Sequence, residues 1–171
     1  MVAVLVIASG CTSGYVVPSG LESDGDFSRF NPSGPGVACR LLAAEEVELA
    51  LNSKVGNALT VGIRPILSGM EMCFVNASTN ETVSWGTLSN AAAGRFSDYE
   101  RINKRYVETL DLEGHRALWD GELRILLVLK QRKAFAVQMA GEGRDLGKAV
   151  KAQEYRKETA KLLAVRALRR L

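Results

Sequence analysis

Few residues in this sequence of 171 amino acids are of types that perform catalysis. His115 is the only histidine and lies in a polar run, 113–116, so any serine or cysteine nucleophile would depend on this one base. The sequence contains neither a Gly-x-Ser-x-Gly elbow nor an HExxH zinc motif. We therefore expect His115 to be a surface residue and the chain to be non-enzymatic, with no cofactor and no metal.

The three cysteines, Cys11, Cys39 and Cys73, do not form a CxxC pair, which excludes a zinc knuckle and a thioredoxin-type motif. Their number and spacing allow one disulfide but do not require it. We expect all three to be small apolar residues of the core.

The N-terminus resembles a lipoprotein signal, because the apolar run 2–8 leads into Ala-Ser-Gly-Cys at 8–11. Two features oppose this interpretation. The first ten residues contain no lysine or arginine, and the apolar run is short for a signal peptide. We expect 2–8 to be a buried strand, with an envelope lipoprotein acylated at Cys11 as an alternative.

Two glycine-rich stretches could suggest phosphate binding. The first, 9–14, is followed by the extended run 15–18, whereas a phosphate cradle needs a helix N-terminus there. The second, 141–147, is one residue off the dinucleotide pattern, and no returning strand follows its helix. We expect both to be loops.

The basic C-terminal segment 148–171 is the strongest functional feature, with a net charge of +6. Such a helix could lie along nucleic-acid phosphates or dock on a protein partner. It could also be a solvated face with local ion pairs, such as Glu158 with Lys161. Tyr155 is its only aromatic residue, whereas single-strand binders interleave several. The candidate contact residues are Lys148, Lys151, Arg156, Lys157, Lys161, Arg166, Arg169 and Arg170.

Composition and charge limit the class of protein. Apolar residues make up 47% of the chain and the net charge is only +3, which excludes disorder as the default. No stretch of 18 residues is free of both charge and turn residues, which argues against a spanning helix. Residues 1–94 carry a net charge of −4 and residues 95–171 a net charge of +7, which indicates two structural layers and a basic surface.

The first half has the pattern of strands joined by turns. The composition of 9–36, rich in glycine, proline and serine, predicts an extended arm. The segment 37–51 is ambiguous, and we expect a strand with a helix as the alternative. Residues 76–80 are expected to form a turn, and the glycosylation sequons that begin at Asn76 and Asn80 are expected to be part of this turn chemistry. Alternating residues then predict strands in an antiparallel meander at 58–67, 70–75 and 81–88.

The second half has a helical pattern. Ser97 and Glu100 resemble a capping box, and Tyr99, Ile102, Tyr106 and Leu110 recur at helical spacing, so we expect a helix over 98–110 with this stripe facing the sheet. Its outward face would carry Arg101, Lys104, Arg105 and Glu108. We then expect a connection at 111–121 with a helical turn at 115–119. A hairpin of strands 123–129 and 134–139 should follow, with a basic tip at 130–133, and one continuous helix is the alternative. A final helix should run from 145 or 146 to 170.

The expected fold is α+β: an antiparallel, mostly N-terminal sheet packed with two main helices from the C-terminal half. Residues 1–147 would form the body and 148–171 a basic helix, in the same domain or projecting. The leading hypothesis is a non-enzymatic structural subunit of a large assembly, most simply a virion or a phage tail or neck component. Its partners would be other protein subunits, including copies of itself, in a virion or cytoplasmic assembly. A nucleic-acid-associated subunit, for example a ribosome-associated one, is an alternative, and a membrane partner is not expected.

Overall fold

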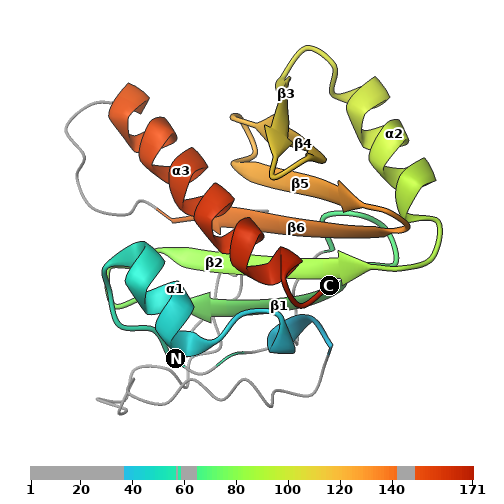
Figure 1. Ribbon diagram of the computed structural model, residues 1–171. Helices are drawn as coiled ribbons and strands as arrows, with labels where there is room; N and C mark the ends of the chain where they lie inside the picture. The colour runs from blue at the N-terminus through green and yellow to red at the C-terminus, as the bar shows by residue number, and fades with distance from the viewer. Residues whose placement is uncertain (1–36, 57, 59–64, 142–148) are drawn as a thin grey trace, which may run out of the picture.

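The computed structural model describes residues 37–56, 58, 65–141 and 149–171, with side chains from 151 onward in the last range. A single antiparallel sheet of six strands carries helices on both faces (Figure 1), which confirms the α+β prediction. Our expectations for 2–8, 9–36, Cys11, 59–64 and 142–148 lie outside the described residues.

The strands follow the order β1-β2-β6-β5-β4-β3 across the sheet, and all neighbours are antiparallel. α2 carries the chain from β2 to the far edge, where β3 begins. The strands are β1 (Glu71–Asn76), β2 (Thr82–Leu88), β3 (Val107–Leu112), β4 (His115–Asp120), β5 (Ile125–Lys130) and β6 (Lys133–Ala140). The helices are the short 3-10 helix η1 (Ala38–Arg40), α1 (Ala44–Leu51), α2 (Ala92–Ile102) and α3 (Ala149–Leu168).

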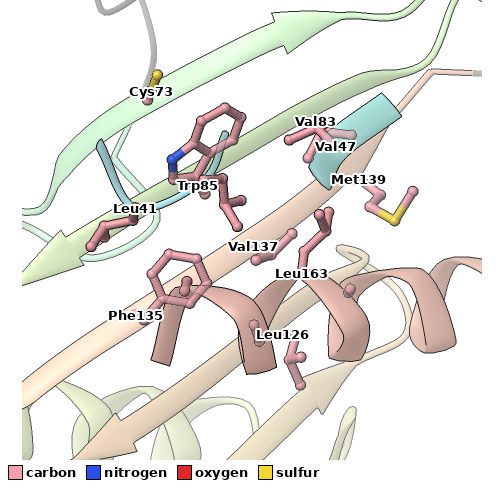
Figure 2. Packing of buried hydrophobic residues seen from close by; sticks show 14 of the residues in the cluster. Leu41, Val47, Cys73, Val83, Trp85, Leu126, Phe135, Val137, Met139 and Leu163 are labelled. Carbon is pink, nitrogen blue, oxygen red and sulfur yellow. The ribbon is translucent and has the colours of Figure 1, made fainter. Parts of the chain in front are cut away.

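The larger core lies between one face of the sheet and the elements η1, α1 and α3. Figure 2 shows Trp85, Phe135 and Leu163 in one apolar layer between the strands and α3. The indole N–H of Trp85 donates to the carbonyl oxygen of Ala38 at 2.7 Å, so η1 is fixed over β2. This face therefore holds the two ends of the described chain against the sheet. In the described residues, no helix is long and apolar enough to span a membrane.

The smaller core lies on the opposite face, under α2. Ala92, Phe96 and Tyr99 recur at helical spacing and pack on the sheet, where Ala134 and Ala136 of β6 leave room for the helix. The phenol of Tyr99 donates to Oδ2 of Asp120 at 2.9 Å. Burial, followed by the hydrogen bond to this carboxylate, raises the pKa of Tyr99.

The expected strand at 37–51 is wrong, because 38–40 is a 3-10 helix and 44–51 is α1. The alternation of 46–51 is too short to decide, and burial follows helical spacing: Val47 and Leu51 are buried, whereas Leu49 is 68% exposed. The Glu46 carboxylate also accepts from the Ala43 amide, which satisfies a donor at the helix start. Of the expected strand 58–67, the described residues 58 and 65–67 are not in a strand.

The expected helix over 98–110 is also wrong. α2 begins at Ala92 and ends at Ile102, residues 103–106 form a turn, and β3 begins at Val107. Asn103 ends the helix, since its side-chain amide donates to the carbonyl oxygen of Tyr99. Tyr99 faces the sheet as expected, but Ile102 is 69% exposed and Tyr106 is 58% exposed. The residues expected to face outward, Arg101, Lys104, Arg105 and Glu108, are exposed.

The connection expected at 111–121, with a helical turn at 115–119, is replaced by a β-hairpin of β3 and β4. Glu113 and Gly114 form its two-residue turn, and both have positive φ, as a type I′ turn requires. The strands near 70–75 and 81–88, the turn between them and the hairpin of β5 and β6 are confirmed. Four of the six strands follow α2, so the sheet extends further toward the C-terminus than expected.

Candidate interaction surfaces

The basic C-terminal helix packs on the sheet, and several of its charged groups contact the rest of the chain. α3 lies against β5, β6 and α1. Its residues Ala160, Leu163 and Ala167 are fully buried. The basic tip of the β5–β6 hairpin contacts this helix as well, because Lys130 and Lys133 donate to the carbonyl oxygens of Leu168 and Leu171. Cations at a helix C-terminus stabilise it by satisfying its last carbonyls and its dipole.

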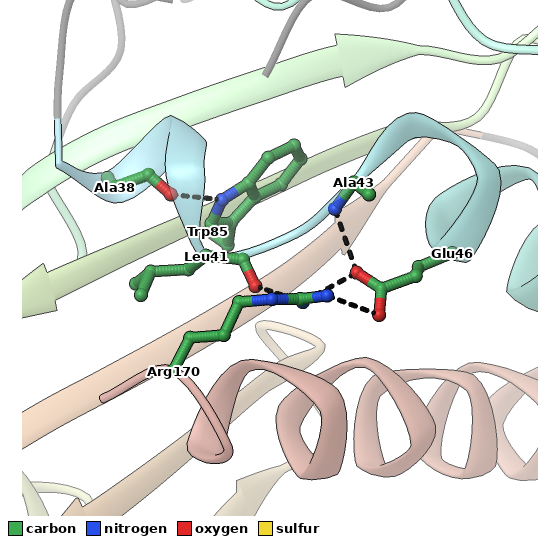
Figure 3. Close-up of polar contacts among 6 residues, drawn as sticks. All are labelled: Ala38, Leu41, Ala43, Glu46, Trp85 and Arg170. Carbon is green, nitrogen blue, oxygen red and sulfur yellow. Dashed lines mark hydrogen bonds and ion pairs between the residues drawn. The ribbon is translucent and has the colours of Figure 1, made fainter. Parts of the chain in front are cut away.

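Arg170 joins the C-terminus to α1 (Figure 3). Its guanidinium donates to both carboxylate oxygens of Glu46, at 2.6 and 2.9 Å, and to the carbonyl oxygen of Leu41 at 2.9 Å. Burial alone would raise the pKa of Glu46, but the hydrogen bonds from Arg170 and from the Ala43 amide outweigh it and lower that pKa. The hydrogen bond to Glu46 in turn raises the pKa of Arg170. Arg170, a candidate contact residue, therefore binds two other segments of the same chain.

Arg156 is 7% exposed and donates to the carbonyl oxygen of Gly141, as Arg124 also does, each at 3.2 Å. Burial lowers the pKa of Arg156, and the nearby charge of Arg124 adds to this effect, while buried Glu81 opposes it. The two guanidinium groups thus converge where β6 ends. Arg156 is therefore buried within the fold and is not part of an exposed basic face.

Ion pairs engage two further candidates. Lys157 pairs with Glu108 of β3 at 2.7 Å, and Lys161 pairs with Glu158 at 2.8 Å, the latter as predicted from spacing. Lys151 and Arg169 are exposed and Arg166 is half-buried, without an ion pair in the described part of the chain. Lys148 lies outside the described residues. The structure therefore does not gather the eight predicted residues on one free surface.

The cysteine prediction needs correction, because Cys39 and Cys73 form a disulfide. Their Cα atoms are 5.1 Å apart, and both residues are fully buried between η1 and β1. Three cysteines in different predicted segments allow three pairings, so the sequence did not identify this one. Near the disulfide, the carboxylate of Glu71 accepts from the amide of Ala38, which adds a second link between η1 and β1.

The isolated candidates do not form a catalytic arrangement in the described residues. His115 is half-buried at the start of β4, within a strand instead of a polar connection. Asn76 ends β1 and Asn80 lies in the following turn, with positive φ. No group of three or more histidine, cysteine, aspartate or glutamate residues with the geometry of a metal site occurs in the ranges that the structure describes.

The outer edge of β3 is a surface that the sequence analysis missed. β3 is the last strand of the sheet and has β4 as its only described neighbour (Figure 1). The loop that leads into it carries Tyr106, and α2 ends just before that loop at Ile102. These two residues are among the most exposed large apolar side chains in the described ranges. The alternation of 107–112 could have identified the strand, but the helical spacing of 99, 102, 106 and 110 obscured it.

Comparison with known proteins identified no relative of this chain. No protein-family model, no curated protein and no solved structure matches the chain.

Proposed function

We propose that the chain is a non-enzymatic structural subunit of a multi-protein assembly, with a virion or a phage tail or neck as the leading example. The observation that carries this proposal is the edge of β3 that no described strand covers, near exposed Ile102 and Tyr106. Unpaired strand groups and large exposed apolar side chains are what a neighbouring protein covers. Other subunits, including copies of this chain, are the proposed partners.

The charged groups of α3 support a structural role. Arg170, Arg156, Lys157 and Lys161 each bind a carboxylate or a carbonyl oxygen of this chain. A side chain that is engaged in this way must lose its partner before it can bind phosphate. The alternative of a nucleic-acid-associated subunit therefore depends on fewer residues than the sequence suggested.

The Cys39–Cys73 disulfide supports a location where disulfides persist. Such locations are oxidising, and they include virion surfaces, cell surfaces and the bacterial periplasm. We therefore favour an assembly outside the reducing cytosol. Within the proposal this replaces the cytoplasmic assembly that the sequence left open.

The test is whether the exposed apolar pair holds the chain in its assembly. We expect Ile102→Ser with Tyr106→Ser to reduce co-purification of other subunits at least about tenfold, since buried apolar contacts dominate such interfaces. Leu49→Ser is the matched control, because Leu49 is 68% exposed on α1. Equal recovery of partner chains with both variants, or no partner chains with the unchanged protein, would exclude this function.

A second candidate, an envelope lipoprotein acylated at Cys11, gains support from the same disulfide. Cys39 and Cys73 pair with each other, which leaves Cys11 as the third cysteine outside that pair. The intact mass of the protein from its own cells tests this candidate. A chain that begins at Cys11 and carries fatty acids would support it, and an unmodified Cys11 would exclude it.

A further inference from the structure

We infer that the free edge of β3 pairs with β3 of a second copy of this chain, antiparallel and with Thr109 facing Thr109 across a two-fold axis. This deepens the proposed function, because it names one partner and the surface that this partner covers. The two six-stranded sheets would join into one sheet of twelve strands. The inference rests on the direction of backbone groups along β3 and on the order of charges beside it.

The backbone of β3 presents free groups at alternate residues. Hydrogen-bonded and non-hydrogen-bonded pairs alternate in an antiparallel ladder, and the pair that closes a two-residue turn is hydrogen-bonded. Leu112 and His115 close the turn here, so Leu112, Leu110 and Glu108 bond to β4. The N–H and C=O groups of Thr109 and Asp111, with the C=O of Val107, then point to the open edge. The Val107 amide is already bonded to the carbonyl oxygen of Asn103.

An antiparallel copy centred on Thr109 uses each of these free N–H groups. Thr109 of each chain donates to Thr109 of the other, and Asp111 of each chain donates to the Val107 carbonyl oxygen of the other. Both Thr109 and Asp111 are exposed, so their side chains do not have to leave a core to allow this pairing. The result is four new backbone hydrogen bonds in an isologous interface.

The charges beside β3 favour a copy of the same chain over an unrelated strand. Lys104 and Arg105 are exposed in the turn before β3, while Asp111 and Glu113 are exposed at its other end. Antiparallel pairing places the basic turn of one copy beside the acidic hairpin tip of the other, twice by symmetry. A register centred on Glu108 would instead oppose two carboxylates, which destabilises a cross-strand pair.

A cysteine at the two-fold axis gives a direct test. We would place Thr109→Cys in the full chain, with Cys11→Ser to remove the other unpaired cysteine. The Cα atoms of a hydrogen-bonded pair are about 5.5 Å apart, which suits a disulfide, so mild oxidation should give a covalent dimer. Asp111→Cys is the matched control: the two copies of residue 111 would be roughly 13 Å apart along the strands, beyond disulfide reach. Cross-linking that is absent at 109, or equal at both positions, would overturn the inference.

A proline substitution and a pair of charge reversals test the interface without a cysteine. Thr109→Pro removes an outward N–H that β4 does not use, so we expect a folded chain whose dimer dissociation constant rises at least about tenfold. Arg105→Glu and Glu113→Arg should each weaken the dimer by about tenfold, and their combination should restore it. A dimer unaffected by the proline, or no rescue by the double variant, would contradict the pairing.

The outcomes separate this inference from the proposed function. A chain that does not cross-link at 109 but co-purifies with other subunits through Ile102 and Tyr106 would refute the β3 pairing only. A cross-linked dimer without other subunits would refute the larger assembly only. Protection of the Thr109 amide in a monomer would mean that another part of the chain covers this edge, which also refutes the pairing.

Discussion

Arg170, one residue before the C-terminus, forms a bidentate ion pair with Glu46, which lies 124 residues earlier on α1. The same guanidinium donates to the carbonyl oxygen of Leu41. One side chain thus joins the last residues, α1 and the segment that follows η1. Arg170, which the sequence suggested as a nucleic-acid or partner contact, therefore links separate segments within the fold.

Removing the Arg170 side chain should destabilise the protein. We expect Arg170→Ala to lower the free energy of unfolding by about 1–2 kcal/mol, because Glu46 and the Leu41 carbonyl oxygen lose a charged donor. Arg169→Ala is the control, because Arg169 is exposed, and it should change stability by less than about 0.5 kcal/mol. Urea denaturation of both variants measures this difference. Equal stability of the two variants would mean that the ion pair contributes nothing.

The same pair predicts a pH dependence in acid. The pKa of Glu46 is lowered in the folded protein from an ordinary value of 4.5, so folding favours its charged form. The stabilisation is then complete above pH 4.5 and is lost as the pH falls through the lower folded pKa. Denaturation of the unchanged protein and of Glu46→Gln should differ at pH 7 and converge in strong acid. A difference that stays constant from pH 7 to pH 2 would refute this origin.

The disulfide should contribute more than any single ion pair. Cys39 and Cys73 close a loop with a sequence separation of 34, which corresponds to about 4 kcal/mol of chain entropy. We expect Cys39→Ala with Cys73→Ala to lower stability by about this amount, and Cys11→Ala to leave the disulfide contribution intact. Thermal unfolding with and without a reductant gives an independent measurement. A reductant that leaves the melting temperature of the unchanged protein unaltered would contradict it.

The packing of α2 gives a prediction opposite to that from the sequence alone. Phe96 is fully buried under α2, whereas Ile102 is 69% exposed. Phe96→Ala should therefore cost about 3–5 kcal/mol, and Ile102→Ala less than about 0.5 kcal/mol. Chemical denaturation of the two variants decides between the two arrangements. A larger loss from Ile102→Ala would restore the helix over 98–110.

Sequence reasoning identified the elements whose patterns are long or bounded by clear turns. The hairpin of β5 and β6 and the helix α3 are of this kind, because a run of apolar residues or of helix-forming residues continues over most of each element. The strands β1 and β2 were found because a run of turn residues separates them. These local features determine their own secondary structure without reference to the rest of the chain.

The errors arose where two periodicities coincide or where distant residues decide. Tyr99, Ile102, Tyr106 and Leu110 match a helix, but Asn103 ends it and the following residues alternate as β3. The positive charge of α3 could be read from the sequence, but the partners of Arg170 and Lys157 lie 124 and 49 residues away in the chain. No local spacing indicates such contacts. The disulfide was missed for the same reason.

The proposed structural subunit can be tested by native mass spectrometry of the unreduced protein, taken from its own cells. The native mass gives the composition of the assembly, and the mass of the released chain after alkylation without reduction gives the number of free thiols on this chain. We expect a complex that contains at least two copies of the chain together with other proteins, and a chain with Cys39 and Cys73 oxidised. A single chain without partners, or one with both cysteines reduced, would contradict a structural subunit that works in an oxidising compartment.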